Sequence, residues 1–230
     1  MNNFLTRYFC PIMIRDTFRH QGLRRQLVQQ LVQRGIQHQD VLEAIGRVPR
    51  HLFMDNAFQE FAYTNDKAIP IDCGQTISQP YTVAYQTQLL NPVKGERILE
   101  IGTGSGYQAA VLAEMGAKVF SIERHKPLFE KTRILLGQLS YLNVKPFYGD
   151  GFRGLPAFAP FDKVLVTCGS PEIPNALLQQ LKTGGTMVIP VGPPMTDQIM
   201  TIVLKRPDGT PEVIELDKVR FVPMLSEKTR

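Results

Sequence analysis

The spacing of hydrophobic positions changes midway along the chain and divides the sequence into two regions. In the first region, Leu23, Leu27 and Leu31 recur at the spacing of one helix face. They predict a helix over residues 18–34, which Gly35 can end. The N-terminal region therefore begins as an amphipathic helical segment.

Three more helices are expected in this region. One starts at Asp40 and stops near residue 46, and Glu43 lies three positions after the aspartate in a capping-box arrangement. Residues 51–62 are mixed aromatic and polar and predict a short helix, and residues 80–90 predict a clear one.

The second region alternates short apolar runs with helical segments. The expected strands are RILEIG, KVFSIE, NVKPFYGD, KVLVTCG and TMVIPVG, and the helices between them are YQAAVLAEMG, KPLFEKTRILLGQLS and IPNALLQQL. This alternation is typical of a doubly wound α/β fold, whose mostly parallel sheet has helices on both faces. Two β-like runs flank Pro207-Asp208-Gly209, so antiparallel strands are expected at the C-terminal end.

The length and composition fit one sizeable core, since 43% of the 230 residues are hydrophobic. We expect one domain over residues 15–230, preceded by a disordered extension at residues 1–14. Within the domain we expect a helical cap and a polar segment over 15–92, the α/β core over 93–195, and antiparallel strands over 196–230. The net charge of +5 is spread out and favours a solvated surface over a nucleic-acid interface.

Three scattered cysteines and four histidines argue against a disulfide framework or a metal site. Free thiols are typical of a reducing compartment, so we expect a cytoplasmic protein. The N-terminal stretch is interrupted by Arg7 and Pro11, which argues against a signal peptide, and no run approaches the length of a membrane span.

A glycine-rich loop, Gly102-Thr103-Gly104-Ser105-Gly106, lies between an expected strand and an expected helix. Glycines there allow a sharp turn and the close approach of a ligand to the backbone. Because Gly104, Gly106 and Ala109 also satisfy the dinucleotide pattern G-x-G-x-x-A, the loop alone leaves the ligand open. A tight turn without any ligand is the structural alternative.

Three acidic residues near the glycine loop indicate which ligand it binds. Glu123 ends the next strand, about twenty residues on, where a carboxylate takes the ribose hydroxyls of an adenosine ligand. Asp150 ends the following strand and can accept from an adenine amino group, although either acid could instead cap a helix. Glu100, directly before the loop, would repel a pyrophosphate but suits the cationic end of S-adenosyl-L-methionine. The acids therefore favour methyl transfer.

Several longer segments support this interpretation: RVPRHLF, AIPIDCGQTISQPYTVA, ILEIGTGSGYQAAVLA, GDGFRG and VTCGSPEIPNALLQQLKTGGTMVIPVG. Together they closely resemble the protein-L-isoaspartate O-methyltransferases, over nearly all of residues 15–224. The resemblance implies a Rossmann-like S-adenosylmethionine-dependent methyltransferase fold. It also implies methylation of the α-carboxylate of L-isoaspartyl residues in damaged proteins and peptides, which initiates repair through the methyl ester and a succinimide. S-adenosyl-L-homocysteine would be the product.

The resemblance marks Ser78 as the active-site serine, with Thr76 and Ile77 beside it. The expected cofactor contacts are Thr76, Ile77, Ser78, Glu100, Gly102, Gly104, Gly106, Glu123, Arg124, Asp150 and Gly151, with no metal. Two departures stand out. Met224-Leu225 replaces the family's leucine-threonine, which removes a hydroxyl, and Asp72 replaces a glycine.

The uncharged segment CGQTISQP suits a carboxylate acceptor. The acceptor is already ionised near neutral pH, so the reaction needs position and partial desolvation but no general base. A hydroxyl can hold one carboxylate oxygen without the loss of nucleophilicity that a lysine or arginine would cause. Ser78 would thus orient the acceptor; its alternative is to cap the helix that starts near Pro80.

Other functions remain to be weighed. An NAD-type dehydrogenase is allowed by the glycines but lacks a recognisable catalytic acid, and a non-catalytic binding module would not need Ser78. A nucleic-acid amino-methyltransferase would carry [DNS]-P-P-[YF] where this chain has Val166-Thr167-Cys168-Gly169. Cys168 is expected to be a small buried thiol, and His51 a packed or capping side chain. We expect a monomer that acts on isoaspartyl proteins, without nucleic acid or membrane.

Overall fold

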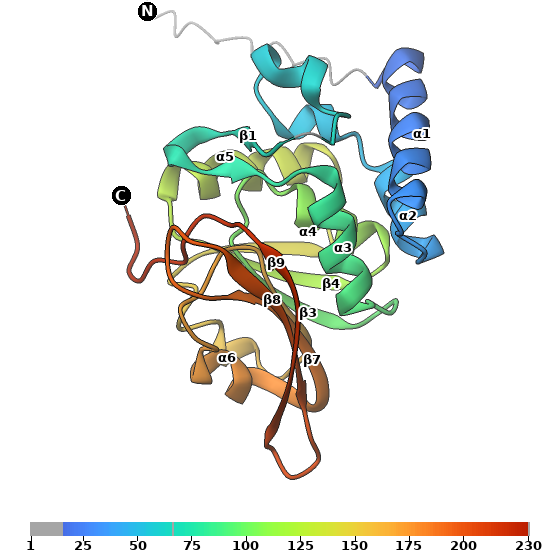
Figure 1. Ribbon diagram of the computed structural model, residues 1–230. Coiled ribbons are helices and arrows are strands. Elements are labelled where there is room, and N and C mark those ends of the chain that lie inside the picture. Colours follow the sequence, from blue (N-terminus) through green and yellow to red (C-terminus); the bar gives the residue numbers. More distant parts are fainter. Residues whose placement is uncertain (1–15, 66, 230) are drawn as a thin grey trace, which may run out of the picture.

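The computed structural model describes residues 16–65 and 67–229, so the extension expected at residues 1–14 lies outside the described residues. A seven-stranded sheet forms the centre of the molecule (Figure 1). The helices are α1 (Phe18–Gln33), α2 (Gln39–Arg47), α3 (Pro80–Leu90), α4 (Tyr107–Glu114), α5 (Lys126–Gln138) and α6 (Asn175–Gln180). Short 3₁₀ helices are η1 (Arg50–Phe53), η2 (Asn56–Phe61), η3 (Asp72–Gly74) and η4 (Pro156–Phe158). The strands are β1 (Ile69–Pro70), β2 (Thr76–Ile77), β3 (Arg97–Ile101), β4 (Lys118–Glu123), β5 (Val144–Tyr148), β6 (Phe161–Val166), β7 (Leu181–Val191), β8 (Gln198–Lys205) and β9 (Pro211–Val219).

The strand order of the large sheet is β5-β4-β3-β6-β7-β8-β9. The pairs from β5 to β7 are parallel, while β8 pairs antiparallel with both β7 and β9. The chain leaves β3 toward β4 and β5 and returns on the other side of β3 as β6. A ligand crevice forms at such a reversal, outside the carboxyl ends of the strands. The doubly wound, mostly parallel sheet and its antiparallel C-terminal strands are therefore confirmed.

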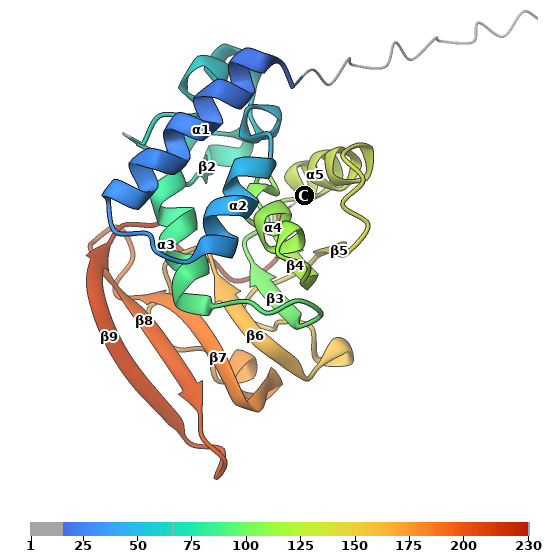
Figure 2. The same ribbon diagram turned by 90° about the vertical axis from the view of Figure 1, so that its right-hand side faces the viewer.

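Side chains of β3 alternate between two hydrophobic cores. Ile98 packs into a core shared with α1, α2, α3 and α4, whereas Leu99 packs into a second core with Leu177 of α6. Figures 1 and 2 show α3, α4 and α5 over one face of the sheet and α6 over the other. Because both faces are covered, β3 is buried at every position after Arg97, as expected of a central strand.

The predicted helices differ from the observed ones mainly at their ends. The helix expected over residues 18–34 is α1, and the helix expected over residues 80–90 is α3. The capping box at Asp40 is wrong, because α2 begins one residue earlier and its N-cap is His38, without a side-chain hydrogen bond. Asp40 lies instead in the first helical turn, where its charge favours the helix dipole.

Two other segments refine the prediction. The short helix expected over residues 51–62 is split into η1 and η2, both 3₁₀ helices. The C-terminal hairpin around Gly209 is confirmed by the antiparallel register of β8 and β9. No helix formed by residues 16–65 or 67–229 is long and apolar enough to cross a membrane.

Candidate active site

The glycine loop follows β3 at the reversal of the sheet order. Gly102, Gly104 and Gly106 have φ values of 98°, 52° and 86°, in the region that side chains with a Cβ disfavour. A Cβ at Gly102 would lie 2.6 Å from Oγ1 of Thr167, the residue after β6. Glycine at this position therefore lets the two central strand ends approach each other.

A first cavity opens beside this loop, with a volume of ≈ 430 Å³. Gly102, Glu123, Arg124 and Gly151, four of the residues expected to contact the cofactor, line it. A Cβ at Gly151 would lie 2.5 Å from Cγ2 of Ile101, so the backbone there is packed directly against the strand end. The carboxyl ends of three neighbouring strands thus converge on one hollow.

The carboxylate of Glu123 is buried at the rim of this cavity, with 4% of its surface exposed. One oxygen accepts from the backbone N–H of Gly104 and the other from the N–H of His125, both at 2.9 Å. The acid therefore fixes the glycine loop against the start of α5. Each oxygen retains a lone pair that a hydroxyl can use.

Asp150 and Arg124 both hold the C-terminal segment. Asp150 accepts from the N–H groups of Phe152 at 2.9 Å and Glu227 at 3.0 Å and does not line the first cavity. Arg124 donates to the carbonyls of Glu227 and Ser226, at 3.0 and 3.2 Å. These contacts bring the segment that carries Met224 and Leu225 to the cavity wall, while an adenine contact by Asp150 stays a prediction.

A second cavity, of ≈ 540 Å³, adjoins the first, and both are lined by Gln75, Gly102 and Cys168. Thr76, Ile77 and Ser78 line it from the β1–β2 hairpin, as do Gly102 and Gly104 from the glycine loop. Its lining, taken over the described residues, contains no lysine, arginine, aspartate or glutamate. The structure therefore brings Thr76, Ile77, Ser78, Gly102 and Gly104 together around an uncharged space, whereas Gly106 does not line it.

Ser78 follows β2 and precedes α3. The N-cap of α3 is Gln79, whose side chain makes no capping hydrogen bond, and Asn65 accepts from the first-turn N–H of Tyr81 at 2.8 Å, so the interpretation of Ser78 as a capping residue is wrong. Pro80 starts the helix because its fixed φ suits the first turn. The Ser78 carbonyl accepts from Nη2 of Arg50 at 2.7 Å, which fixes the backbone of the turn while the residue lines the second cavity.

Glu100 lies beneath the glycine loop and lines neither cavity. Its side chain is fully buried, one oxygen accepts from the Ser121 hydroxyl, and the other has no partner among the described residues. Burial raises its pKa to about 8, and the nearby Glu123 adds to this rise, whereas the Ser121 hydrogen bond opposes it. Ser121 in turn lies 2.6 Å from the hydroxyl of Thr103 in the loop, so Glu100 reaches the site only through intermediates.

Cys168 lies between the two cavities. Its thiol is buried, and desolvation raises its pKa to about 12, with a smaller contribution from Glu123. A thiol with so high a pKa is not a nucleophile at neutral pH. The expectation of a small buried thiol is therefore confirmed.

Several cavity residues were missed in the sequence. Gln75, Ser105 and Tyr107 lie within or beside the recognised motifs, so their positions in the sequence could have identified them as cavity residues. Thr167 was considered only in the comparison with the [DNS]-P-P-[YF] motif, yet its hydroxyl donates to the carbonyls of Ile101 and Gly102, at 2.9 and 2.8 Å. Met224 reaches the first cavity from the far end of the chain, which no local pattern reveals.

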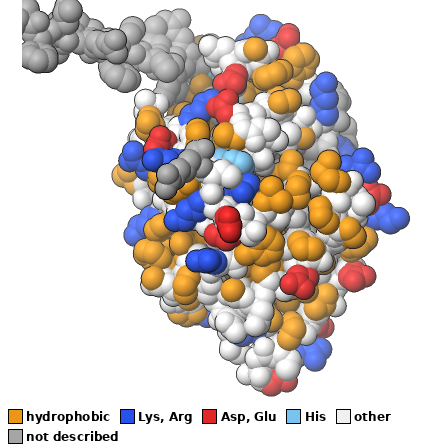
Figure 3. All heavy atoms as spheres, turned by 90° about the vertical axis from the view of Figure 1, so that its left-hand side faces the viewer, with side chains coloured by type: hydrophobic (Ala, Val, Ile, Leu, Met, Phe, Trp, Pro, Cys, Tyr) orange, Lys and Arg blue, Asp and Glu red, His pale blue; other side chains and the backbone are white. Residues whose placement is uncertain are grey.

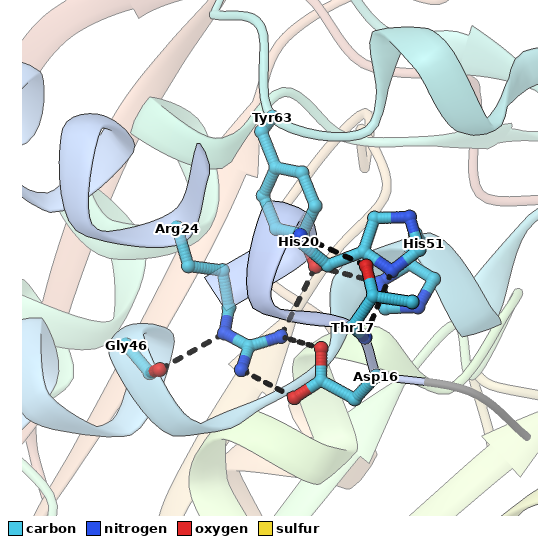
Figure 4. Close-up of polar contacts among 7 residues, drawn as sticks. All are labelled: Asp16, Thr17, His20, Arg24, Gly46, His51 and Tyr63. Atoms are coloured by element: carbon cyan, nitrogen blue, oxygen red, sulfur yellow. Dashed lines mark hydrogen bonds and ion pairs between the residues drawn. The ribbon is translucent and has the colours of Figure 1, made fainter. Parts of the chain in front are cut away.

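Side chains of metal-ligand type meet at one place among the described residues, where Asp16, His20 and His51 lie together (Figure 4). Both Asp16 oxygens accept from Arg24, at 2.7 and 2.8 Å, and the guanidinium holds the pKa of Asp16 below its usual range. A metal ion would have to displace this ion pair. The cluster instead ties α1 to η1, because the rings of His20 and His51 stack 3.7 Å apart. His51 is packed, as expected.

Known proteins of one family share both the sequence and the fold. The family model described as protein-L-isoaspartate(D-aspartate) O-methyltransferase matches residues 22–229. A protein-L-isoaspartate O-methyltransferase of Flavobacterium psychrophilum is 53% identical over 215 residues, which cover 94% of this chain and 100% of that protein. The corresponding protein of Christiangramia forsetii is 52% identical over 216 residues, with 94% of this chain and 100% of that protein covered.

Two solved structures are also similar to this chain. A protein-L-isoaspartate O-methyltransferase is similar with a TM-score of 0.80 and 28% identity, and the match covers 87% of this chain and 65% of that chain. A Plasmodium falciparum structure, titled a putative protein-L-isoaspartate O-methyltransferase in complex with S-adenosyl-L-homocysteine, supports the fold with a TM-score of 0.77. It is 24% identical, with 88% of this chain and 98% of that chain covered. From these matches, this chain belongs to the protein-L-isoaspartate(D-aspartate) O-methyltransferase family.

Proposed function

We propose that the chain methylates the α-carboxylate of L-isoaspartyl residues in damaged proteins and peptides, with S-adenosyl-L-methionine as the methyl donor. The first cavity would hold the adenosine part of the cofactor, and the second would hold the acceptor residue. The observation that carries the proposal is the position of Ser78 in the wall of an uncharged cavity next to the glycine loop, with its hydroxyl not used to cap α3.

The residues of the first cavity fit the cofactor. Gly102 and Gly151 leave a cradle that any Cβ would disturb, and the Glu123 carboxylate lies at its rim. Glu100 lies beneath the loop and lines neither cavity, and because burial raises its pKa to about 8 it is mostly protonated at neutral pH and supplies little negative potential to the cofactor. When bound, S-adenosyl-L-methionine supplies a methyl group on a positively charged sulfur. Gly102, Gly151 and Glu123 would hold it, and the role of Asp150 at the adenine stays part of the proposal.

The second cavity would position the acceptor. The Ser78 hydroxyl would donate to one carboxylate oxygen and leave the other oxygen free to attack. An uncharged lining leaves that oxygen nucleophilic, because no cation binds it directly. No side chain needs to remove a proton, which accords with the high pKa of Cys168.

Substitution of Ser78 tests the proposal. The assay follows methyl transfer from labelled cofactor to paired peptides that carry isoaspartate or aspartate at the same site. For Ser78→Ala we expect about 10- to 100-fold lower turnover of the isoaspartyl peptide, the worth of one hydrogen bond to a charged group. Binding of S-adenosyl-L-homocysteine should be unchanged, and Ser78→Thr should restore part of the rate. An unchanged rate in Ser78→Ala would exclude the assigned role.

We also propose that the protein is a cytoplasmic monomer that acts without nucleic acid. A cytoplasmic location is supported by Cys73 and Cys168, which are both free thiols. Action without nucleic acid is supported by the surface in Figure 3, where basic, acidic and apolar side chains are interspersed. A monomer is supported by β9, the sheet edge, which exposes Glu215 and Lys218 among its apolar residues. Light scattering at micromolar concentration would detect a dimer.

A further inference from the structure

Arg50 is a buried cation directly behind the Ser78 turn. It starts η1 and is fully buried. Its Nε donates to the carbonyl of Ala62 at 2.8 Å and its Nη2 to the carbonyl of Ser78 at 2.7 Å. In the part of the chain that the structure describes, Nη1 has no hydrogen-bond partner of good geometry and no carboxylate forms an ion pair with the guanidinium, although the Tyr107 hydroxyl favours its charged form.

The charge of Arg50 is not required for these two hydrogen bonds. A neutral side chain with N–H groups can also donate to carbonyls, and burying an uncompensated cation is strongly unfavourable. Burial lowers the pKa of Arg50 to about 10, so the guanidinium remains charged at neutral pH. Its Cζ lies 4.6 Å from the ring centroid of Tyr107, a partial compensation by the face of an aromatic ring. Within residues 16–65 and 67–229, the remaining charge has no counterion.

The surroundings hold Arg50 in place. His51, which follows Arg50, forms a hydrogen bond with Tyr63, which follows Ala62; Nδ1 and the tyrosine hydroxyl lie 2.7 Å apart (Figure 4). Arg24 donates to the same hydroxyl at 3.2 Å. This network braces η1 against the segment that contains Ala62. The guanidinium is therefore fixed in position relative to the Ser78 turn.

The second cavity is lined by two of the residues that contact Arg50. Ser78 and Tyr107 both line it, while its lining contains no cation among the described residues. We propose that Arg50 is the positioning residue whose charge selects an anionic acceptor, acting through the Ser78 turn without touching the carboxylate. This inference rests on the proposed function. Held behind the turn, the cation attracts the carboxylate but leaves both of its oxygens free of a strong charged hydrogen bond.

The test compares two peptides that differ only in charge at the acceptor. One carries L-isoaspartate, and the other carries the neutral isoasparagine, whose α-amide replaces the α-carboxylate. Calorimetry with saturating S-adenosyl-L-homocysteine gives the ratio of their dissociation constants. We expect the native protein to prefer the carboxylate by about tenfold or more, and Arg50→Gln to reduce the ratio to near one. Arg50→Lys should retain the preference at neutral pH.

A purely structural role gives a different result. If Arg50 only holds the Ser78 carbonyl, Arg50→Gln weakens both peptides by the same factor, and the unchanged ratio overturns the proposal. If Arg50→Gln does not fold, the ratio is measured for Arg50→Lys and for the native protein at pH 6.5 and 8.5. Arg50, whose pKa is lowered only to about 10, stays charged at both pH values, whereas a buried lysine loses its proton in or near this range. Glu100 titrates alike in both proteins, so the preference should fall further in the variant than in the native protein, and an equal change in both overturns the proposal.

The same experiment separates the two proposals. A native protein that neither methylates the isoaspartyl peptide nor prefers it over the amide refutes the proposed function itself. A native protein that prefers the carboxylate, with variants that share this preference undiminished, refutes only the role of Arg50.

Discussion

The buried carboxyl of Glu100 should make the stability of the protein depend on pH. Its pKa is raised from 4.5 to about 8 in the folded state, mainly because desolvation penalises the charged form. Between these two pH values the folded state keeps a proton that the unfolded state has released. Stability therefore falls as the pH rises through this window and reaches its full loss above pH 8.

The size of the effect follows from the shift. At about 1.4 kcal/mol per pKa unit, a rise from 4.5 to about 8 corresponds to at most about 5 kcal/mol of unfolding free energy. The perturbation is Glu100→Gln, which keeps the shape and an oxygen to accept from Ser121 but cannot ionise. The amide leaves one buried N–H₂ group unpaired, a cost that is the same at every pH.

Urea unfolding of both proteins at pH 5, 7 and 9 measures the effect. We expect the variant to gain stability relative to the native protein with each step, by about 2 to 5 kcal/mol in total. Glu60→Gln, the same chemical change at an exposed position, is the matched control. If the difference between Glu100→Gln and the native protein is constant from pH 5 to pH 9, Glu100 is not a protonated buried acid and the reasoning fails.

Two further predictions concern the glycine loop and the cysteines. Gly102→Ala should lose at least about 2 kcal/mol more stability than Gly95→Ala and bind S-adenosyl-L-homocysteine more than tenfold more weakly, as measured by urea unfolding and calorimetry. Both glycines have positive φ, but only Gly102 would bring a Cβ to 2.6 Å from Thr167, so equal losses would exclude the collision as the cause. Cys73 is exposed and Cys168 is buried with its pKa raised to about 12, so iodoacetamide at pH 7.5 should alkylate Cys73 at least about 100-fold faster. Peptide mass mapping over time measures both sites, and similar rates would refute the buried position of Cys168.

Much of the fold was predictable because local patterns agreed with the final packing. The helix at residues 80–90 and the strand ending at Ile101 were found from periodicity and composition alone. The start of α2 was mispredicted because aspartate is favourable both as an N-cap and in the first turn, and the sequence does not distinguish the two. Packing of Val41 and Ile45, both fully buried, fits the helix as observed.

Less of the candidate site than of the fold was predictable from the sequence. Motifs located Ser78, Glu123 and the glycine loop, but the functions of Asp150 and Arg124 in holding the C-terminal segment were not visible in sequence. Those contacts join residues that are far apart in the chain. Only folding brings them within hydrogen-bond distance.

The sequence by itself determined the order of strands and helices along the chain, the glycine turn and the uncharged segment CGQTISQP, because each depends on neighbouring residues. The tertiary structure decided which charges are buried near the site. The sequence located Glu100 beside the glycine loop and indicated no role for Arg50, and only the fold shows that both are fully buried. Desolvation acts on a side chain through everything packed around it, and that environment exists only when distant segments meet.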